Sequence, residues 1–143
     1  MINFKKIIIT ILLVLTLTSI IVVASEDNTQ NINFEKCSTG DLNRFANDIM
    51  DYYLNSNNTI SNYIGVIDSD VFREMNDNSL KLNCKIATIV VDRVYPNNSS
   101  TGDLVILINT KVWDQEQTYN NLYLMELHVN RDGKIYGYNI WAY

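Results

Sequence analysis

Two ionisable side chains near the end of the chain have types and a spacing that could support acid–base chemistry. Glu126 and His128, the only histidine, lie two residues apart in the apolar run LYLMELHVN. Side chains alternate between the two faces of a β-strand, so this carboxylate and this imidazole point to the same side. The pair could move a proton, with Tyr136 or Tyr138 donating to a developing oxyanion. Because the sequence shows no enclosed position for a substrate, we interpret the pair as structural and predict no catalytic residue.

Other reactive groups are few. The two cysteines are Cys37 and Cys84. Outside the cytosol they could form a disulfide that closes a loop of about fifty residues and stabilises by about 3 to 4 kcal/mol, or they could remain two buried free thiols. The sequence leaves both states open. There is no CxxC, no second histidine and no GxSxG, so we predict no metal site, no cofactor and no hydrolase nucleophile.

The first 24 residues indicate export. Lys5 and Lys6 precede an almost unbroken apolar run from Ile7 to Ala24, a pattern typical of a signal peptide or a membrane anchor. Val22 and Ala24 have the spacing that signal peptidase recognises, yet a run of about eighteen residues can also cross a bilayer. We therefore expect residues 1–24 to be either a cleaved signal or a retained anchor. In both cases the rest of the chain is secreted or lies on the extracellular face of the cytoplasmic membrane.

Charge and composition narrow the function classes. After residue 24 the chain has nine basic and sixteen acidic residues, a formal charge of −7. The basic residues are scattered, whereas binding to nucleic acid requires them gathered on one face, so we exclude a nucleic-acid partner. The abundance of Ile, Asn, Lys and Tyr with a single Pro indicates an AT-rich genome, which together with the short export segment is typical of a Gram-positive bacterium.

Hydrophobic periodicity predicts one α+β domain. Residues 25–36 have little apolar content and are predicted to form a flexible leader, so we place the domain at residues 37–143. Apolar residues at three- and four-residue spacing predict a helix in 38–55 that is capped by Ser38, Thr39 or Asp41. Short helical pieces follow, with Ser61 capping one and Ser69 or Asp70 the other. The helix stripe consists of Leu42, Phe45, Ala46, Ile49, Tyr52 and Tyr53.

Four runs rich in Ile, Val, Leu and aromatics then predict an antiparallel meander, with strands within 80–96, 102–114, 119–130 and 133–143. The preceding helices are expected to cover one face of this four-stranded sheet. We expect Trp113 and Trp141, near strand ends, at the edge of the core. The residues that we expect in the core itself are Phe45, Ile49, Tyr52, Phe72, Ile89 and Leu127.

The closing hairpin allows two registers. NRDGK suits a type I turn followed by Gly133 in the left-handed conformation. In this favoured register Asn130 pairs with Lys134, and further along the strands His128 faces Tyr136, Glu126 faces Tyr138 and Leu124 faces Ile140. A tighter two-residue turn would set Arg131 opposite Lys134 and would place Gly137 beside His128 and Asn139 beside Glu126.

The helix DLNRFANDIMDYYLN, the turn VFREMND and the hairpin LHVNRDGKIYGYNIW together resemble the cone-shaped fold of the nuclear-transport-factor-2-like superfamily. The resemblance covers about residues 41–141. It implies that a cavity lies inside the cone, as in the steroid isomerases and dehydratases of that superfamily. It also implies a likeness to the extracellular subunits of Gram-positive conjugation and type IV secretion channels, although this chain has one domain where many of those have two.

Two functions from different classes are consistent with these patterns. The favoured hypothesis is an exported, non-catalytic binding or assembly module, including an accessory of a conjugation or secretion apparatus, with a protein partner or further copies of itself at the cell surface. The alternative is a small-molecule enzyme or carrier that uses the interior of the cone. The two differ in whether Glu126, His128, Tyr136 and Tyr138 converge in a closed pocket or point into water.

Overall fold

The structure is a computed structural model that describes residues 31–96, 103–113 and 120–143. The predicted signal or anchor, residues 1–24, and the first part of the leader, residues 25–30, lie outside the described residues. Within the described ranges, no helix combines the length and the apolar character that crossing a bilayer requires.

The predicted first helix is α2, Thr39–Asn55, and its whole apolar stripe is buried. Ser38 is the N-cap, because its Oγ accepts a hydrogen bond from the Asp41 N–H at 3.1 Å. The helix ends at Ser56, which adopts the left-handed conformation with φ 62° and donates its N–H to the Tyr52 carbonyl.

Two short helices connect α2 to the sheet. The first is a 3₁₀ helix, η1, at Ser61–Val66, and the second is α3 at Ser69–Asp77. The predicted caps were wrong here: no side chain caps η1, and α3 is capped by Asp68, whose Oδ1 accepts from the Asp70 N–H at 2.9 Å. A carboxylate one residue earlier satisfies the same free N–H groups at the start of the helix.

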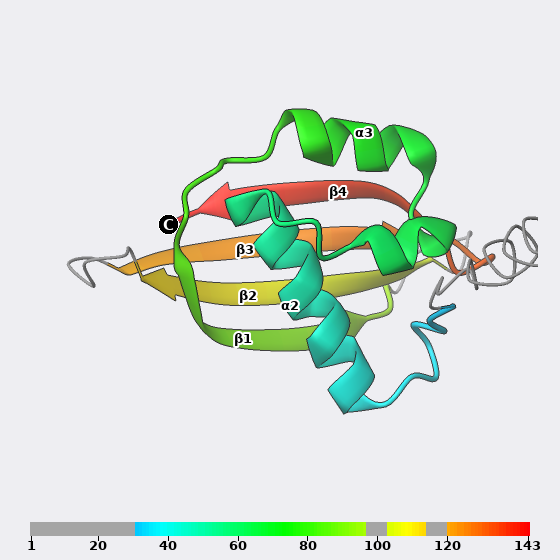
Figure 1. Cartoon of the computed structure of the whole chain (residues 1–143). Coiled ribbons are helices and arrows are strands. Elements are labelled where there is room, and N and C mark those ends of the chain that lie inside the picture. The colour runs from blue at the N-terminus through cyan, green and yellow to red at the C-terminus, as the bar shows by residue number, and fades with distance from the viewer. Residues whose placement is uncertain (1–30, 97–102, 114–119) are drawn as a thin grey trace, which may run out of the picture.

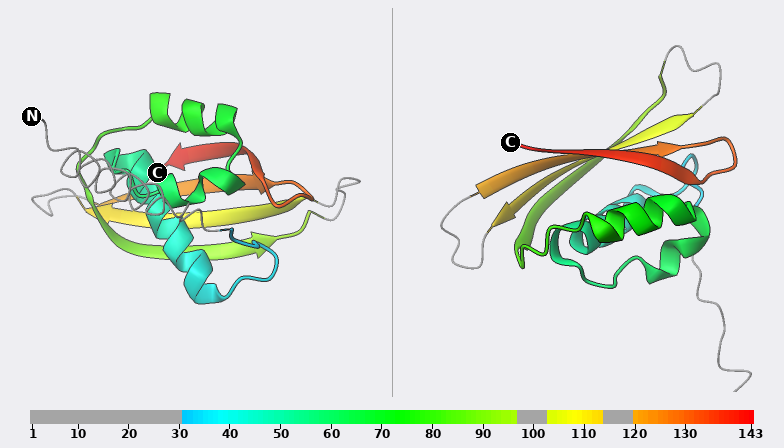
Figure 2. Two further views of the ribbon diagram at one scale, coloured as in Figure 1. Left: turned by 45° about the vertical axis from the view of Figure 1, so that its right-hand side comes forward. Right: turned by 90° about the horizontal axis from the view of Figure 1, so that it is seen from above.

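The meander is confirmed. Strands β1 (Lys85–Val94), β2 (Leu104–Trp113), β3 (Asn120–Val129) and β4 (Ile135–Ala142) form one open antiparallel sheet in the order β1-β2-β3-β4. α2 crosses this sheet diagonally and α3 runs beside β4 (Figure 1). Both helices lie on the same side of the sheet, as the view from above shows (Figure 2). The inner face meets the helices, and we call the opposite face the outer face.

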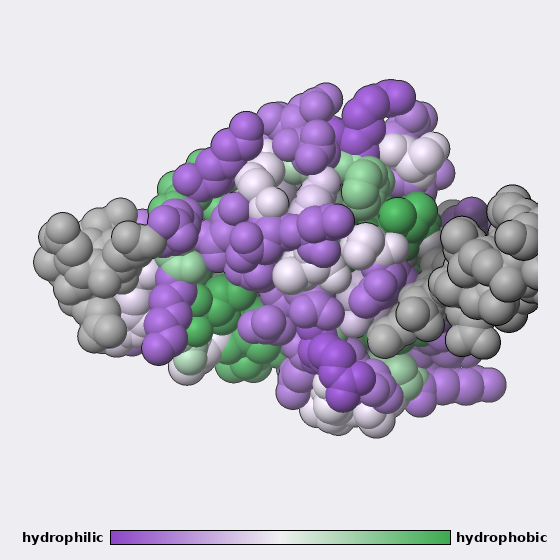
Figure 3. Space-filling model, viewed as in Figure 1, coloured by the Kyte–Doolittle hydropathy of each residue, from purple (hydrophilic) through white to green (hydrophobic). Residues whose placement is uncertain are grey.

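The inner face forms the core. Along β2 and β3 every second residue is buried, from Leu104 to Val112 and from Tyr123 to Val129. Of the predicted core residues, Phe45, Ile49, Tyr52 and Leu127 are buried, whereas Phe72 and Ile89 are half-buried and pack against the cluster. Seen from the helix side, the surface is mainly hydrophilic, with a hydrophobic area where β1 and β2 extend from beneath α2 (Figure 3).

The last residues of the predicted leader are packed, which corrects its boundary. Phe34 is only 1% exposed and contacts Phe45 edge to face, with 4.9 Å between ring centroids. Arg93, at the end of β1, donates to the carbonyl oxygens of Phe34 and Cys37 at 2.6 and 2.7 Å. A single aromatic residue in a polar segment has no periodicity, so its burial was not predictable from local pattern.

Candidate functional site

The turn of the closing hairpin has the favoured geometry. Gly133 has φ 77° and donates its N–H to the Asn130 carbonyl, while the Asn130 N–H donates to the Lys134 carbonyl at 2.9 Å. The Asn130 side chain also accepts from the N–H groups of Asp132 and Lys134, both at 3.0 Å. Val129 then pairs with Ile135, as the three-residue turn requires.

The predicted pairing beyond this point was wrong, because a bulge follows at once. The register shifts between Val129 and His128, so that His128 lies opposite Gly137 and Glu126 opposite Asn139. Tyr136 is the extra residue of β4. The physical reason is burial: Ile135, Tyr138 and Ile140 can all face the helices only if one residue is inserted between the first and the second of them.

The bulge separates the groups that a catalytic site would have needed together. Tyr138 turns to the inner face, where its ring meets that of Tyr53 at 5.9 Å and its hydroxyl accepts from the Asn78 side chain at 3.2 Å. Tyr136 stays on the outer face, 47% exposed, and donates its hydroxyl to Asp103 at 2.9 Å.

Glu126 and His128 lie on the outer face with Asn139. His128 Nε2 is 3.8 Å from Glu126 Oε2, and the Asn139 amide nitrogen lies 3.5 Å from that oxygen and 3.3 Å from Nε2. The Glu126 and His128 side chains are each about 30% exposed. Neither helix covers this side of the sheet (Figure 2). The pair therefore faces away from the interior that the enzyme or carrier alternative would use.

The outer face is unusually apolar for a solvent-facing side of an antiparallel sheet, where polar residues are the norm. Its exposed hydrophobic side chains include Val90 at 55%, Leu122 at 43% and Trp141 at 41%. The expectation that Trp141 lies at the core edge was wrong, since it pairs with Leu124 on the outer face. β2 shows a further signal: its run LVILI is apolar at consecutive positions, so it has hydrophobic residues for both faces. The half-buried apolar residues on this face include Val105, Leu107 and Leu124.

The two cysteines do not form a disulfide. Cys37 and Cys84 are both free thiols. Cys37 immediately precedes the cap of α2, whereas the backbone of Cys84 is hydrogen-bonded to the side chain of Asn55 at the other end. A helix of 17 residues is about 25 Å long, and a disulfide needs Cα atoms within about 7 Å. Burial raises the pKa of the Cys84 thiol, which lowers its reactivity.

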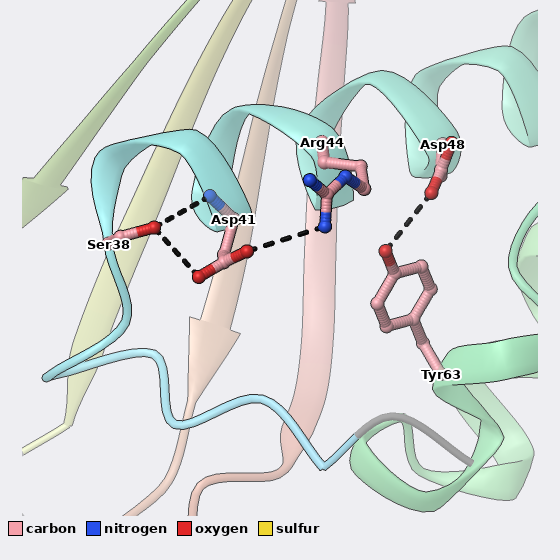
Figure 4. Close-up of polar contacts among 5 residues, drawn as sticks. All are labelled: Ser38, Asp41, Arg44, Asp48 and Tyr63. Atoms are coloured by element: carbon pink, nitrogen blue, oxygen red, sulfur yellow. Dashed lines mark hydrogen bonds and ion pairs between the residues drawn. The ribbon is translucent and has the colours of Figure 1, made fainter. Parts of the chain in front are cut away.

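A polar pair that the sequence did not reveal joins α2 to η1. Tyr63 donates its hydroxyl to Asp48 Oδ2 at 3.0 Å, one turn beyond the Ser38, Asp41 and Arg44 contacts at the start of α2 (Figure 4). Burial raises the pKa of Asp48, against the lowering effect of this hydrogen bond, and raises the pKa of Tyr63 to about 12. A contact between residues fifteen apart has no local signature. We interpret the pair as a fastening of η1 to α2.

A groove of about 510 Å³ lies at the hairpin end of the sheet, between residues 31–35 and the turn 130–134. It is lined by charges of both signs, including Glu35, Asp132 and Lys134, and it contains neither Glu126 nor His128. Across the described part of the chain, no group of three His, Cys, Asp or Glu side chains is placed to hold a metal ion. Neither feature selects a particular ligand.

Comparisons with protein-family models, with curated proteins and with solved structures find no match for this chain. The resemblance to the nuclear-transport-factor-2-like superfamily therefore stays a prediction. The α+β order of helices followed by an antiparallel meander stands on the structure itself.

Proposed function

We propose that the chain is an exported, non-catalytic binding or assembly module whose docking surface is the outer face of the sheet. The observation that carries this proposal is the apolar character of a face that no described element covers. Exposed contiguous hydrophobic surface is unfavourable in water and typically marks an interaction site. An extracellular location rests on the basic and apolar start of the chain, MINFKKIIITILLVLTLTSIIVVAS.

The position of Glu126 and His128 favours binding over catalysis. A general acid or base acts best in an enclosed site that holds the substrate and excludes water. These two side chains instead lie on an open sheet face, among residues such as Leu107 and Leu124. On a docking surface, the same groups would provide polar contacts within an apolar patch.

Site-specific photo-crosslinking in the native host tests the docking surface. A photoreactive phenylalanine analogue replaces Val90 on the outer face, and the matched control replaces Glu74, which is exposed on α3 on the helix side. We expect a discrete adduct from the Val90 position and none from the Glu74 position. Equal yields at both positions, or no adduct at either, would contradict the proposal.

Export is tested separately by fractionation and mass spectrometry. We expect either a mature chain that begins at Ser25 in the secreted fraction or the intact chain in the membrane fraction. Full-length protein that accumulates in the cytosol would remove the basis for an extracellular role.

A further inference from the structure

We propose that the occupant of the outer face is a second copy of this chain, docked face to face about a two-fold axis that runs across the strands. This inference rests on the proposed function, because it names the partner of the same surface. It follows from the arrangement of charge on that face.

Cross-strand pairing arranges the outer face in rows. The central row is uncharged and consists of Val90, Asn109, Leu124 and Trp141, one residue from each strand. On the side toward the hairpin turn, the next row carries both acids of the central face, Asp92 and Glu126, at either side of Leu107.

The row on the other side of the central one carries the opposite charge. Lys111 lies there between Thr88 and Leu122. Its ammonium is 5.6 Å from the centre of the Trp113 ring, and within the described residues neither Lys111 nor Asp92 has an ion-pair partner. The face therefore has an acidic row and a basic row at equal distances from a neutral one.

A two-fold axis along the central row exchanges the acidic and basic rows. Each strand then faces itself with its direction reversed, so that Lys111 of the second copy lies over Leu107. Leu107 is flanked by Asp92 and Glu126 on the neighbouring strands, at the spacing of directly paired residues of about 5 Å. Each lysine thus enters between two carboxylates, and the symmetry produces this contact twice.

The same operation places apolar groups together at the centre. Val90, Leu124 and Trp141 each meet their own counterpart, and Asn109 meets Asn109, whose amides can donate to and accept from each other. Face-to-face sheets pack about 10 Å apart with a rotation of about 30°, which long side chains such as lysine can bridge. An axis along the strands would instead place each acidic row on itself, which repulsion disfavours.

The area of the face is sufficient for a stable dimer. Four strands of eight to ten residues cover roughly 19 by 33 Å, or about 600 Å² for each copy. Two such faces bury about 1,200 Å², which is the lower limit for specific protein interfaces.

Charge reversal provides the test, with the full chain recovered from the secreted or membrane fraction in the form that the cell leaves it. Sedimentation is expected to show a dimer for the parent. Lys111→Glu, and separately Asp92→Lys with Glu126→Lys, should each weaken association about tenfold or more, because like charges then meet. An equimolar mixture of the two variants should restore the dimer, since both contacts become attractive again.

A second measurement does not depend on charge-reversed variants. In a Cys37→Ser and Cys84→Ser background, Asn109→Cys lies on the axis and should be linked to its counterpart by a short bismaleimide. Thr88→Cys lies on the same face but away from the axis, so it should not be linked. A parent that sediments as a monomer at the highest concentration reached, variants that dimerise like the parent, or equal cross-linking at both positions would overturn the proposal.

The outcome is distinguishable from failure of the proposed function. If the photoreactive group at Val90 captures a different protein, the binding module stands and the dimer is excluded. If it captures this chain, both stand.

Discussion

Gly137, and not Tyr136, lies opposite His128 in the closing hairpin. The inserted Tyr136 allows Ile135 and Tyr138 to share the inner face although they are three residues apart. This single bulge decides which aromatic side chains accompany the Glu126 and His128 pair.

Deletion of Tyr136 should therefore be tolerated. Without it, Ile135 and Tyr138 become alternate residues of a regular strand, and only the hydrogen bond to Asp103 is lost. Deletion of Asn139 is the matched control, because it turns Ile140 to the outer face and should lower the melting temperature by several degrees. Thermal unfolding followed by circular dichroism compares the two, and the bulge is misassigned if deletion of Tyr136 proves the more damaging.

Phe34→Ala should cost about 3 to 5 kcal/mol of unfolding free energy, as expected for a fully buried phenylalanine. The reason is the loss of its contact with Phe45 and of the packing that holds the segment before α2. Glu35→Ala, at an exposed neighbouring position, should change stability by less than about 0.5 kcal/mol. Urea unfolding measures both, and equal effects would return this segment to a flexible leader.

Thr110→Val should raise stability by about 1 kcal/mol. Thr110 is fully buried on the inner face, and its hydroxyl is without a hydrogen-bond partner in the described structure, so it carries an uncompensated desolvation cost. Thr88→Val, on the outer face and exposed, provides the control and should have little effect on the monomer. A loss of stability in the Thr110 variant, measured by urea unfolding, would indicate that the hydroxyl has a partner.

The domain should lose stability in alkaline solution through Tyr63. Burial and the hydrogen bond to Asp48 raise the pKa of Tyr63 to about 12, above the value of about 10 in an unfolded chain. The folded state holds this proton more tightly, so the stabilisation is complete below about pH 10 and is lost as the pH rises through about 12. Urea unfolding at pH 9 and pH 11 should show a smaller decrease for Tyr63→Phe than for the parent, and an equal decrease would refute the assignment.

Reduction should leave the melting temperature unchanged. Cys37 and Cys84 lie at opposite ends of α2, too far apart to be linked within one chain. Thiol titration of the denatured protein without reductant should find two thiols for each chain. Finding none, together with a monomer on a non-reducing gel, would be incompatible with the structure.

The sequence alone was sufficient for the elements and for most of the core. The spacing of Leu42, Phe45 and Ile49 predicts α2 and its buried side, and alternation along β3 predicts that Met125 and Leu127 share a face. These predictions succeed because burial repeats with the local period of the backbone, 3.6 residues in a helix and two in a strand. The same local information indicates the turn at Gly133, whose positive φ depends on only a few residues.

Only the tertiary structure decided which face of the sheet the helices cover and which residues therefore meet. Glu126 and His128 share a strand face in any arrangement, but their exposure depends on the contact of α2 and α3 with the opposite face. The burial of Phe34, the Asp48–Tyr63 contact and the separation of the two cysteines likewise depend on segments distant in sequence. Periodicity records that a residue is buried but not what buries it, so these relationships appear only when the layers are assembled.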